Sequence, residues 1–203
     1  DACYYDFIIN HQFQFPLANI YNHDPIHGKE ETGITANSMN GDEFRKYLFM
    51  QGTRGTSFWE LYYSNDLLDE EKYLINSDFL HWVENNFSKL KNAKMIGGKP
   101  AENTTLNPHI NIINQNPYGF SCFDDNGGII SMRNPDNKTK TLTFKLDESI
   151  GVKSDGTYYM TLEHGYINSG NLTPTKSIFK KGEIININLQ PGETQIWNLN
   201  LKK

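Results

Sequence analysis

The sequence predicts an α/β N-terminal segment followed by an all-β antiparallel sandwich, in a chain of 203 residues. Two observations predict this order. Segments typical of strands and helices alternate over residues 1–92, whereas helical periodicity is almost absent after Met95. Short alternating runs separated by Gly, Pro, Asn and Asp fill residues 93–203, which is typical of a sandwich. We therefore expect a partial β/α segment over 1–92 and an antiparallel β-sandwich domain over 93–203.

Two apolar runs predict the strands of the first segment. Residues 15–21 form a short run bounded by Pro16 and by the polar residues from Asn22 onward, which favours a strand buried on both faces, as in a parallel sheet. Residues 57–63 are rich in aromatic side chains and predict the next strand.

Apolar residues at steps of three and four predict helices over 42–51 and 69–91. Asp42 is placed to cap or charge the N-terminus of the first helix. Its expected buried face consists of Phe44, Tyr47, Leu48 and Gln51. The apolar face expected of the second helix consists of Tyr73, Leu74, Phe79, Leu80, Val83, Phe87 and Leu90. Trp82 and Trp197 lie within apolar patterns, and we expect both in the core.

The order strand, helix, strand, helix indicates right-handed crossovers around a parallel sheet. Two βα units cannot close such a sheet, because each strand needs hydrogen-bonding neighbours and helices over both faces. We therefore consider two arrangements. Residues 1–92 are the tail of a β/α barrel whose other strands lie upstream, or they pack as a layer on the later sheet.

The second domain is predicted to contain six short strands. Apolar and polar residues alternate at 142–146 and 185–189, so one face of each strand is expected to be buried. Turn residues mark 124–128, 134–137, 154–156 and 190–192. The strands are expected over 118–123, 128–133, 139–146, 158–163, 183–189 and 193–201.

Composition argues against several classes of partner. The formal net charge is −5 and no run is rich in Lys or Arg, which disfavours nucleic acid and anionic membrane surfaces. No segment has the roughly 18 consecutive apolar residues of a membrane span, and the first residues lack the pattern of a signal peptide. We expect a neutral substrate and a chain that is a mature or truncated piece.

Cys3 and Cys122 are the only cysteines. They are far apart in the sequence and either pair or stay free, but two are too few for a disulfide scaffold or a zinc cluster. The sequence also contains no Gly-rich phosphate loop, nucleophile elbow or Cys/His catalytic pair. We expect neither a cofactor nor a metal.

Residues 52–64 have the composition of the rim of a carbohydrate site. A turn of small residues carrying Arg54 leads into an aromatic run that contains Glu60. Aromatic rings offer apolar faces to the C–H groups of a sugar, while Arg and carboxylate groups orient hydroxyls through charge-assisted hydrogen bonds. The predicted substrate-binding residues of this segment are Arg54, Trp59, Tyr62 and Tyr63. The alternative is a strand whose polar residues simply face water.

If residues 1–92 are the tail of a β/α barrel, the loops after residues 15–21 and 58–63 lie at the face where active sites form, and Glu60 and Asp24 are the predicted catalytic residues. Glycoside hydrolysis needs two carboxylates, about 5 Å apart for retention or roughly 6.5–9.5 Å apart for inversion. Glu60 lies between Trp59 and Leu61, and desolvation by such side chains raises the pKa of a carboxyl toward that of a general acid. A buried ion pair between Glu60 and Arg54 would explain both residues structurally.

His23 and His27 flank Asp24 in the loop after the first strand, and we predict that both bind substrate. Asp24 precedes Pro25, so it would equally initiate a turn. A loop metal site of Asp24 with both histidines is a further alternative, although Pro25 prevents the helix that would place the two histidines on one face. Residues 124–127 resemble half of a calcium loop, but a hairpin turn is expected there.

The order of elements resembles the C-terminal end of a retaining α-glycosidase, in which the last strands of a β/α barrel are followed directly by an antiparallel sandwich. Residues 95–98, 118–121 and 128–135 look like the junction and first sandwich hairpin of large secreted bacterial glycan hydrolases. The types most similar are the endo-α-N-acetylgalactosaminidases and the α-galactosidases. In that family the catalytic carboxylates lie on middle strands of the barrel, which this chain does not contain.

The resemblance implies the C-terminal portion of a secreted or cell-surface glycoside hydrolase that acts on α-linked glycans. Its partners would be a glycan or oligosaccharide and the upstream barrel region of the same protein. The chain alone would then lack the full catalytic set. The alternative function is a non-catalytic carbohydrate-binding or cell-surface interaction module, and a self-contained enzyme with a small α+β fold is a third.

Overall fold

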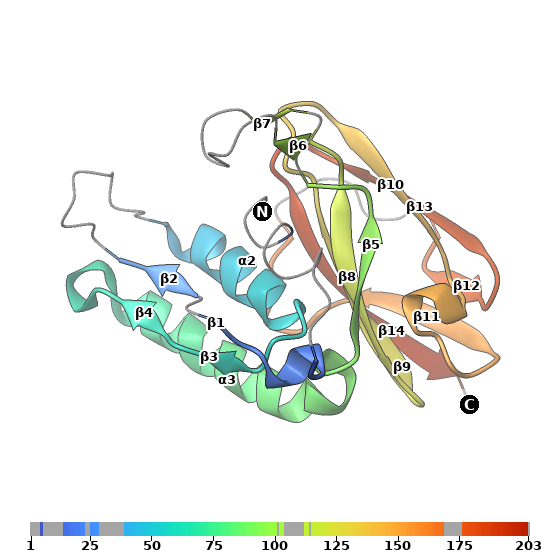
Figure 1. Ribbon diagram of the computed structural model, residues 1–203, viewed down its shortest axis with the longest axis horizontal. Coiled ribbons are helices and arrows are strands. Elements are labelled where there is room, and N and C mark those ends of the chain that lie inside the picture. The colour runs from blue at the N-terminus through green and yellow to red at the C-terminus, as the bar shows by residue number, and fades with distance from the viewer. Residues whose placement is uncertain are drawn as a thin grey trace.

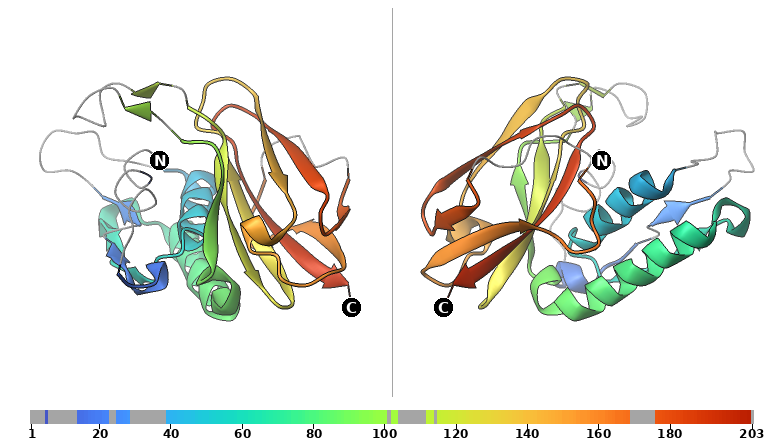
Figure 2. Two further views of the ribbon diagram at one scale, coloured as in Figure 1. Left: turned by 45° about the vertical axis from the view of Figure 1, so that its right-hand side comes forward. Right: turned by 180° about the vertical axis from the view of Figure 1, so that it is seen from behind.

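The computed structural model describes residues 5, 14–22, 25–28, 39–100, 102–103, 112–113, 115–168 and 176–202. Four layers succeed one another in space (Figure 2). Short parallel strands form the first layer, and two long helices form the second. A six-stranded antiparallel sheet follows, and a two-stranded antiparallel sheet covers its far face. The expected fold class, an α/β segment followed by an antiparallel β domain, is confirmed.

Helix α2 (Gly41–Gly52) begins at a capping box, and Figure 1 shows it beside the six-stranded sheet. The side chain of Asn40 accepts a hydrogen bond from Glu43 N at 2.9 Å, and Glu43 Oε2 accepts one from Asn40 N at 3.0 Å. Two backbone donors of the first turn are thereby satisfied. The helix predicted over 42–51 is confirmed. Its cap is Asn40, and Asp42 lies in the first turn, where it supplies negative charge as the second predicted alternative.

Helix α3 (Glu70–Leu90) confirms the second predicted helix and part of its predicted apolar face, since Phe79 and Leu90 are buried and Val83 packs against the core. Asp69 caps it by accepting a hydrogen bond from Lys72 N at 2.9 Å. The buried residues are Lys72, Ile75, Phe79, Trp82 and Leu90, whereas Tyr73, Leu74, Leu80 and Phe87 are exposed. The buried stripe follows the contact with α2, where the Phe49 ring lies 4.7 Å from that of Trp82.

The first layer consists of two short parallel pairs. Strand β1 (Tyr21–Asn22) pairs with β3 (Phe58–Trp59), and β2 (Ile26–His27) pairs with β4 (Tyr62–Tyr63). The expected parallel arrangement of the strand, helix, strand segment is therefore confirmed. Each predicted strand is, however, shorter and less regular than expected.

The buried strand predicted over 15–21 is wrong for most of its length. Residues Leu17–Asn19 form a short 3-10 helix, and Asn19 N donates to Pro16 O at 2.8 Å. Pro16 lacks a backbone donor for a ladder, which favours a turn at this point. The strand predicted over 57–63 is interrupted at Glu60, because Tyr63 N bonds to Leu61 O at 3.1 Å within its own chain segment.

The six-stranded sheet has the order β12-β11-β14-β9-β8-β5, and each neighbouring pair is antiparallel. Its strands are β5 (Ala93–Gly97), β8 (Tyr118–Asp124), β9 (Gly127–Arg133), β11 (Thr157–Leu162), β12 (Ile178–Lys180) and β14 (Thr194–Lys202). The two-stranded sheet pairs β10 (Lys140–Lys145) with β13 (Ile184–Leu189), and β6 (Glu102–Asn103) pairs with β7 (Ile112–Ile113). All six predicted strands are present, and the pattern-based prediction missed β5, β6, β7 and β12.

The six-stranded sheet is buried on both faces. Side chains alternate along each strand, so Ile129 contacts the helix layer while Ile130 contacts the two-stranded sheet. In the same way, Ile196 contacts the helix layer and Trp197 contacts the two-stranded sheet. Trp197 is therefore in the core, as predicted. The helices of the first segment therefore pack as a layer on the later sheet.

Cys122 is a free thiol buried between the helices and the sheet, and its Sγ donates to Thr53 O at 3.4 Å. Burial raises the pKa of this thiol. Cys3 lies outside the described residues.

Among the described helices, none has both the length and the apolar character that crossing a membrane requires. Residues 124–127 form the predicted hairpin turn, in which Asp124 accepts a hydrogen bond from Asn126 N at 2.8 Å.

Candidate functional site

Large side chains are exposed on the face of the strand layer that lies away from the helices. Along β2 and β4 the side chains alternate, so that Ile26 and Tyr62 are exposed while His27 and Tyr63 pack against Phe44 of α2. The exposed set in these strands and beside them comprises Tyr21, Ile26, Leu61 and Tyr62. We call these four residues the outer face. Apolar patches of this kind mark binding or interaction surfaces in soluble proteins.

Glu60 follows directly after β3, at the carboxyl end of that strand. Its Oε2 accepts a hydrogen bond from the hydroxyl of Tyr21 on the neighbouring strand β1. This hydrogen bond raises the pKa of Tyr21, because losing the phenolic proton would break it and place two negative charges together. The structure thus joins a predicted catalytic residue to an aromatic hydroxyl that the sequence did not single out.

Tyr62, a predicted substrate-binding residue, is 57% exposed on the outer face. Tyr21 is 52% exposed there. Two phenol rings and the Glu60 carboxylate therefore occur within one short layer. Rings of this kind can contact the C–H groups of a sugar, and a carboxylate can accept hydrogen bonds from its hydroxyl groups.

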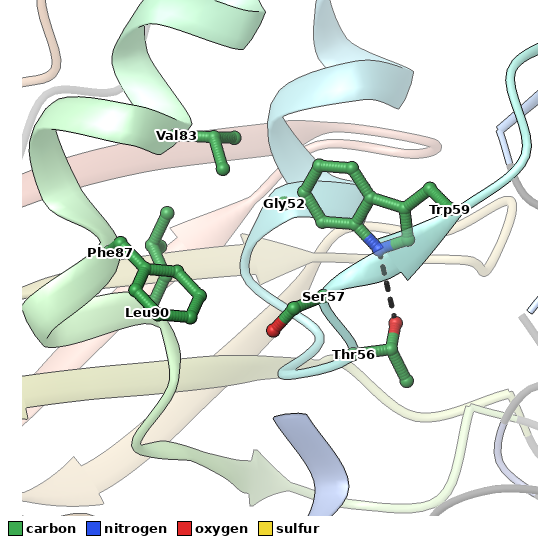
Figure 3. Close-up of a pocket in the computed structure, with 7 residues that line it drawn as sticks. All are labelled: Gly52, Thr56, Ser57, Trp59, Val83, Phe87 and Leu90. Atoms are coloured by element: carbon green, nitrogen blue, oxygen red, sulfur yellow. Dashed lines mark hydrogen bonds between the residues drawn. The ribbon is translucent and has the colours of Figure 1, made fainter. Parts of the chain in front are cut away.

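Trp59 is turned toward the helices. Its ring stacks on Phe79 with centroids 5.5 Å apart, and its Nε1 donates to Thr56 Oγ1 at 3.3 Å. It lines a small cavity of about 100 Å³, shown in Figure 3, together with Gly52, Thr56, Ser57, Val83, Phe87 and Leu90. Ligand pockets usually measure about 300–1,000 Å³, so this space is too small for a sugar.

His27 and Tyr63 lie beneath the outer face. The His27 ring is fully buried 5.0 Å from Phe44, and its Nε2 lies 3.4 Å from Leu67 O. The Tyr63 hydroxyl donates to Asn76 Oδ1 at 3.0 Å, and burial raises the pKa of this phenol. In this structure both side chains connect the strand layer to the helices, so their contact with substrate stays a prediction.

Arg54 and Glu60 have different partners. Arg54 is buried, and its Nη1 donates to Gln51 Oε1 at 2.9 Å. With Lys46 and Arg133 it lines a cavity of about 480 Å³ at the junction of α2 with the six-stranded sheet. Glu60, by contrast, bonds to Tyr21 in the strand layer. The predicted alternative, a buried ion pair between Glu60 and Arg54, is not formed in the structure.

Asp24 and His23 lie outside the described residues. The separation of the Asp24 and Glu60 carboxyl groups, and the loop metal site of Asp24 with His23 and His27, therefore stay predictions. Within the described ranges, no group of three or more His, Cys, Asp or Glu side chains is placed to hold a metal ion.

Sequence comparison yields no relative for this chain: no protein-family model and no curated protein matches it. Solved structures do match in shape, among them glycoside hydrolases. A GH27 β-L-arabinopyranosidase from Geobacillus stearothermophilus, in complex with arabinose, gives a TM-score of 0.48 at 12% identity, over 85% of this chain and 34% of that one. An α-galactosidase from Saccharomyces cerevisiae gives 0.47 at 10% identity, over 85% and 46%.

A third match, α-galactosidase I from Mortierella vinacea, has a TM-score of 0.43 at 12% identity, over 83% of this chain and 37% of that one. This chain thus spans about a third to a half of the length of these solved structures. The similarity is to part of each glycoside hydrolase.

Proposed function

We propose that this chain is the C-terminal portion of a glycoside hydrolase acting on α-linked glycans. The strand layer would contribute to the substrate site, and the antiparallel sheets would buttress the barrel. The observation that carries the proposal is the outer face itself, where Tyr21, Glu60 and Tyr62 come together on short parallel strands. Such an enzyme would work outside the cell or at the cell surface.

The order of layers supports a barrel tail. In a β/α barrel the strands lie inside and the helices outside, and active sites form at the carboxyl ends of the strands. Here α2 and α3 lie between the strand layer and the six-stranded sheet, so the outer face corresponds to the inside of a barrel. Glu60 follows the carboxyl end of β3, where a substrate-contacting residue belongs.

The strand pairing supports the same proposal. In the described residues each parallel sheet has two strands, and each strand has two residues. Parallel sheets this small are rarely stable on their own, because parallel strands are normally buried on both faces. Further strands of an upstream barrel region would pair with these edges and cover Ile26 and Leu61.

The hydrogen bond from Tyr21 suggests a role for Glu60. The hydroxyl of Tyr21 holds the Glu60 carboxylate in one orientation at the end of β3. A carboxylate oriented in this way suits an acceptor for substrate hydroxyl groups. Asp24 remains our proposed partner carboxylate, and His23 a proposed substrate contact.

The proposal is tested with two proteins: this chain, and the protein made from the complete reading frame that encodes it. Aryl α-galactosides and aryl α-N-acetylgalactosaminides serve as probes. We expect little hydrolysis by this chain and measurable hydrolysis by the complete protein, which Glu60→Gln or Asp24→Asn then lowers. Absence of hydrolysis from the complete protein would contradict the proposal.

The exposed rings of Tyr21 and Tyr62 favour one alternative, a non-catalytic carbohydrate-binding module. Exposed rings suffice to bind a glycan without any catalytic pair. Isothermal titration of this chain with oligosaccharides separates the two functions. Micromolar binding, combined with no turnover by the complete protein, would favour the module.

A further inference from the structure

A third cavity lies between α3 and the turn that follows β11, and none of its lining residues belongs to the outer face. Its volume is about 360 Å³, within the range of small-ligand sites. The polar side chains that line it include Asp78, His81, Trp82, Asn85, Glu163 and His164. None of the lining residues in the described chain is Lys or Arg.

Glu163 carries a buried carboxylate oxygen into this cavity. The residue is 5% exposed, and its Oε2 is buried without a hydrogen-bond partner. A buried acceptor in that condition costs about 1–3 kcal/mol, so native proteins usually satisfy such groups with protein, water or ligand. Burial raises the pKa of Glu163, and the nearby indole of Trp82 partly opposes the rise.

Trp82 brings a donor to the same place. Its Nε1 is buried and makes no hydrogen bond of ordinary geometry in the structure. The ring is 7% exposed and packs between Phe49, at 4.7 Å, and Phe79, at 6.3 Å. The ring faces are therefore covered, and Trp82 offers a ligand its N–H group, with little ring surface to stack on.

The turn that contains Glu163 is held in place by hydrogen bonds to neighbouring elements. Glu163 N donates to Ile196 O at 3.1 Å, and Tyr166 N donates to Glu163 O at 3.2 Å. Gly165 has a φ of +82°, which favours glycine, and its carbonyl accepts a hydrogen bond from Arg45 of α2. The carboxylate is thus presented by a turn that is already ordered, which reduces the entropy lost on binding.

A buried acceptor beside a buried donor matches a hydroxyl group. A hydroxyl donates to Glu163 Oε2 and accepts from Trp82 Nε1 at the same time. An ammonium group has no lone pair to accept from the indole, and a carboxylate or phosphate has no proton to donate to Glu163. Asn85, His81 and His164 add hydrogen-bonding groups for further hydroxyls.

We propose that this cavity binds a neutral polyhydroxylated ligand of monosaccharide size, with one hydroxyl bridging Glu163 and Trp82. The site goes beyond the proposed function and does not rest on it, because Glu60 and the outer face are not involved. Failure of one proposal leaves the other standing.

The test is a titration of the ¹⁵N-labelled chain with D-galactose and D-glucose, followed through the indole N–H resonances. Trp59, Trp82 and Trp197 are the three tryptophans, and Trp82→Phe assigns the resonance concerned. We expect a saturable shift at Trp82 with a midpoint below about 100 mM sugar, and no shift at Trp197. No saturable shift with either sugar would mean that water alone satisfies the two groups, and would overturn the proposal.

Variants and other probes sharpen the result. Glu163→Gln should weaken the sugar affinity about tenfold, because it replaces one acceptor oxygen by a donor. Glu148→Gln, an exposed carboxylate paired with Lys181, is the matched control and should leave the affinity unchanged. If Glu163→Gln does not fold, His164→Ala at the exposed rim should weaken binding severalfold. Methylammonium or acetate producing the Trp82 shift in place of sugars would also overturn the proposal.

Discussion

Single buried polar side chains join the layers of this protein, and Asn134 is the clearest case. It is fully buried at the end of β9, and its Nδ2 donates to Lys138 O at 2.7 Å and to Leu189 O at 3.1 Å. Its Oδ1 accepts a hydrogen bond from Asp136 N at 3.1 Å. One side chain thus links the six-stranded sheet to the end of β13 and shapes the turn toward β10.

We predict that Asn134→Ala lowers the free energy of unfolding by about 1–3 kcal/mol, because buried carbonyl groups lose their donor. Urea unfolding followed by circular dichroism measures the change. Asn188→Ala is the matched control, since Asn188 bonds to Thr141 on an exposed surface, and it should change stability by no more than about 0.5 kcal/mol. Equal effects from both variants would show that the linking role is wrong.

Glu163 should make stability depend on pH. Burial raises its pKa above the ordinary value of 4.5, so the folded chain keeps this proton over a pH range in which the unfolded chain has lost it. The contribution of Glu163 to stability therefore falls as the pH rises from about 4.5 through the raised pKa. Glu163→Gln removes this loss, so the stability of the variant relative to the unaltered chain should increase from pH 4 to pH 7.

Glu183 provides the control of opposite sign. The hydrogen bond from Lys176 lowers the pKa of Glu183, so its contribution is present above the ordinary pKa and is lost as the pH falls. Glu183→Gln should therefore lose relative stability as the pH rises over the same range. Urea unfolding at the two pH values checks both variants, and the same trend in both would refute the assignment for Glu163.

At the scale of elements, the prediction succeeded where the signal is local. Helical periodicity and an N-terminal cap lie within a few residues of each other, so α2 and α3 were located nearly to the residue. The strands of the second domain were found because turn residues and alternation bracket each one. The predicted apolar face of α3 was right at Phe79 and Leu90 and wrong at the residues that are exposed, because the buried side depends on which side meets α2 and the sheet, a long-range contact.

The candidate site shows the same limit. Glu60 was identified from residue type and neighbours, but its partner Tyr21 lies 39 positions earlier and becomes adjacent only through the parallel pairing of β1 and β3. Trp59 and Tyr63 were grouped with Tyr62 because all are aromatic. In strands of two residues, sequence alone does not decide which side faces the helices.

The capping box of α2 gives a prediction for that element. Asn40→Ala removes the acceptor for Glu43 N and should lower the free energy of unfolding by about 1 kcal/mol. Thermal or urea unfolding measures the loss. Ser77→Ala on the exposed side of α3 is the control, with an expected change within about 0.5 kcal/mol. A neutral Asn40→Ala would mean that water replaces the cap without loss.

At the scale of the whole molecule, the six-stranded sheet is the central layer shared by two cores. Phe79 of α3 belongs to the core between helices and sheet, and Leu142 belongs to the core between the two sheets. Neighbouring residues of one strand, such as Ile129 and Ile130, contribute to different cores. Disturbing either core should therefore affect the common sheet.

We predict that the two cores unfold together. Phe79→Ala and Leu142→Ala should each cost about 2–5 kcal/mol, and each should reduce the hydrogen-exchange protection of both α3 and β13. Native-state amide exchange measures this for each element. If Phe79→Ala loosens α3 and leaves β13 fully protected, the predicted division at residues 92 and 93 would mark two independent folding units.

The central claim is that the outer face belongs to a glycosidase substrate site, and one kinetic measurement tests it most directly. The kcat/KM for an aryl α-galactoside is compared between the complete protein and its Glu60→Gln variant, with Glu84→Gln on the exposed side of α3 as control. We predict at least a tenfold loss, about 1.4 kcal/mol of transition-state stabilisation, in Glu60→Gln only. An unchanged kcat/KM in a folded Glu60→Gln protein would contradict the claim.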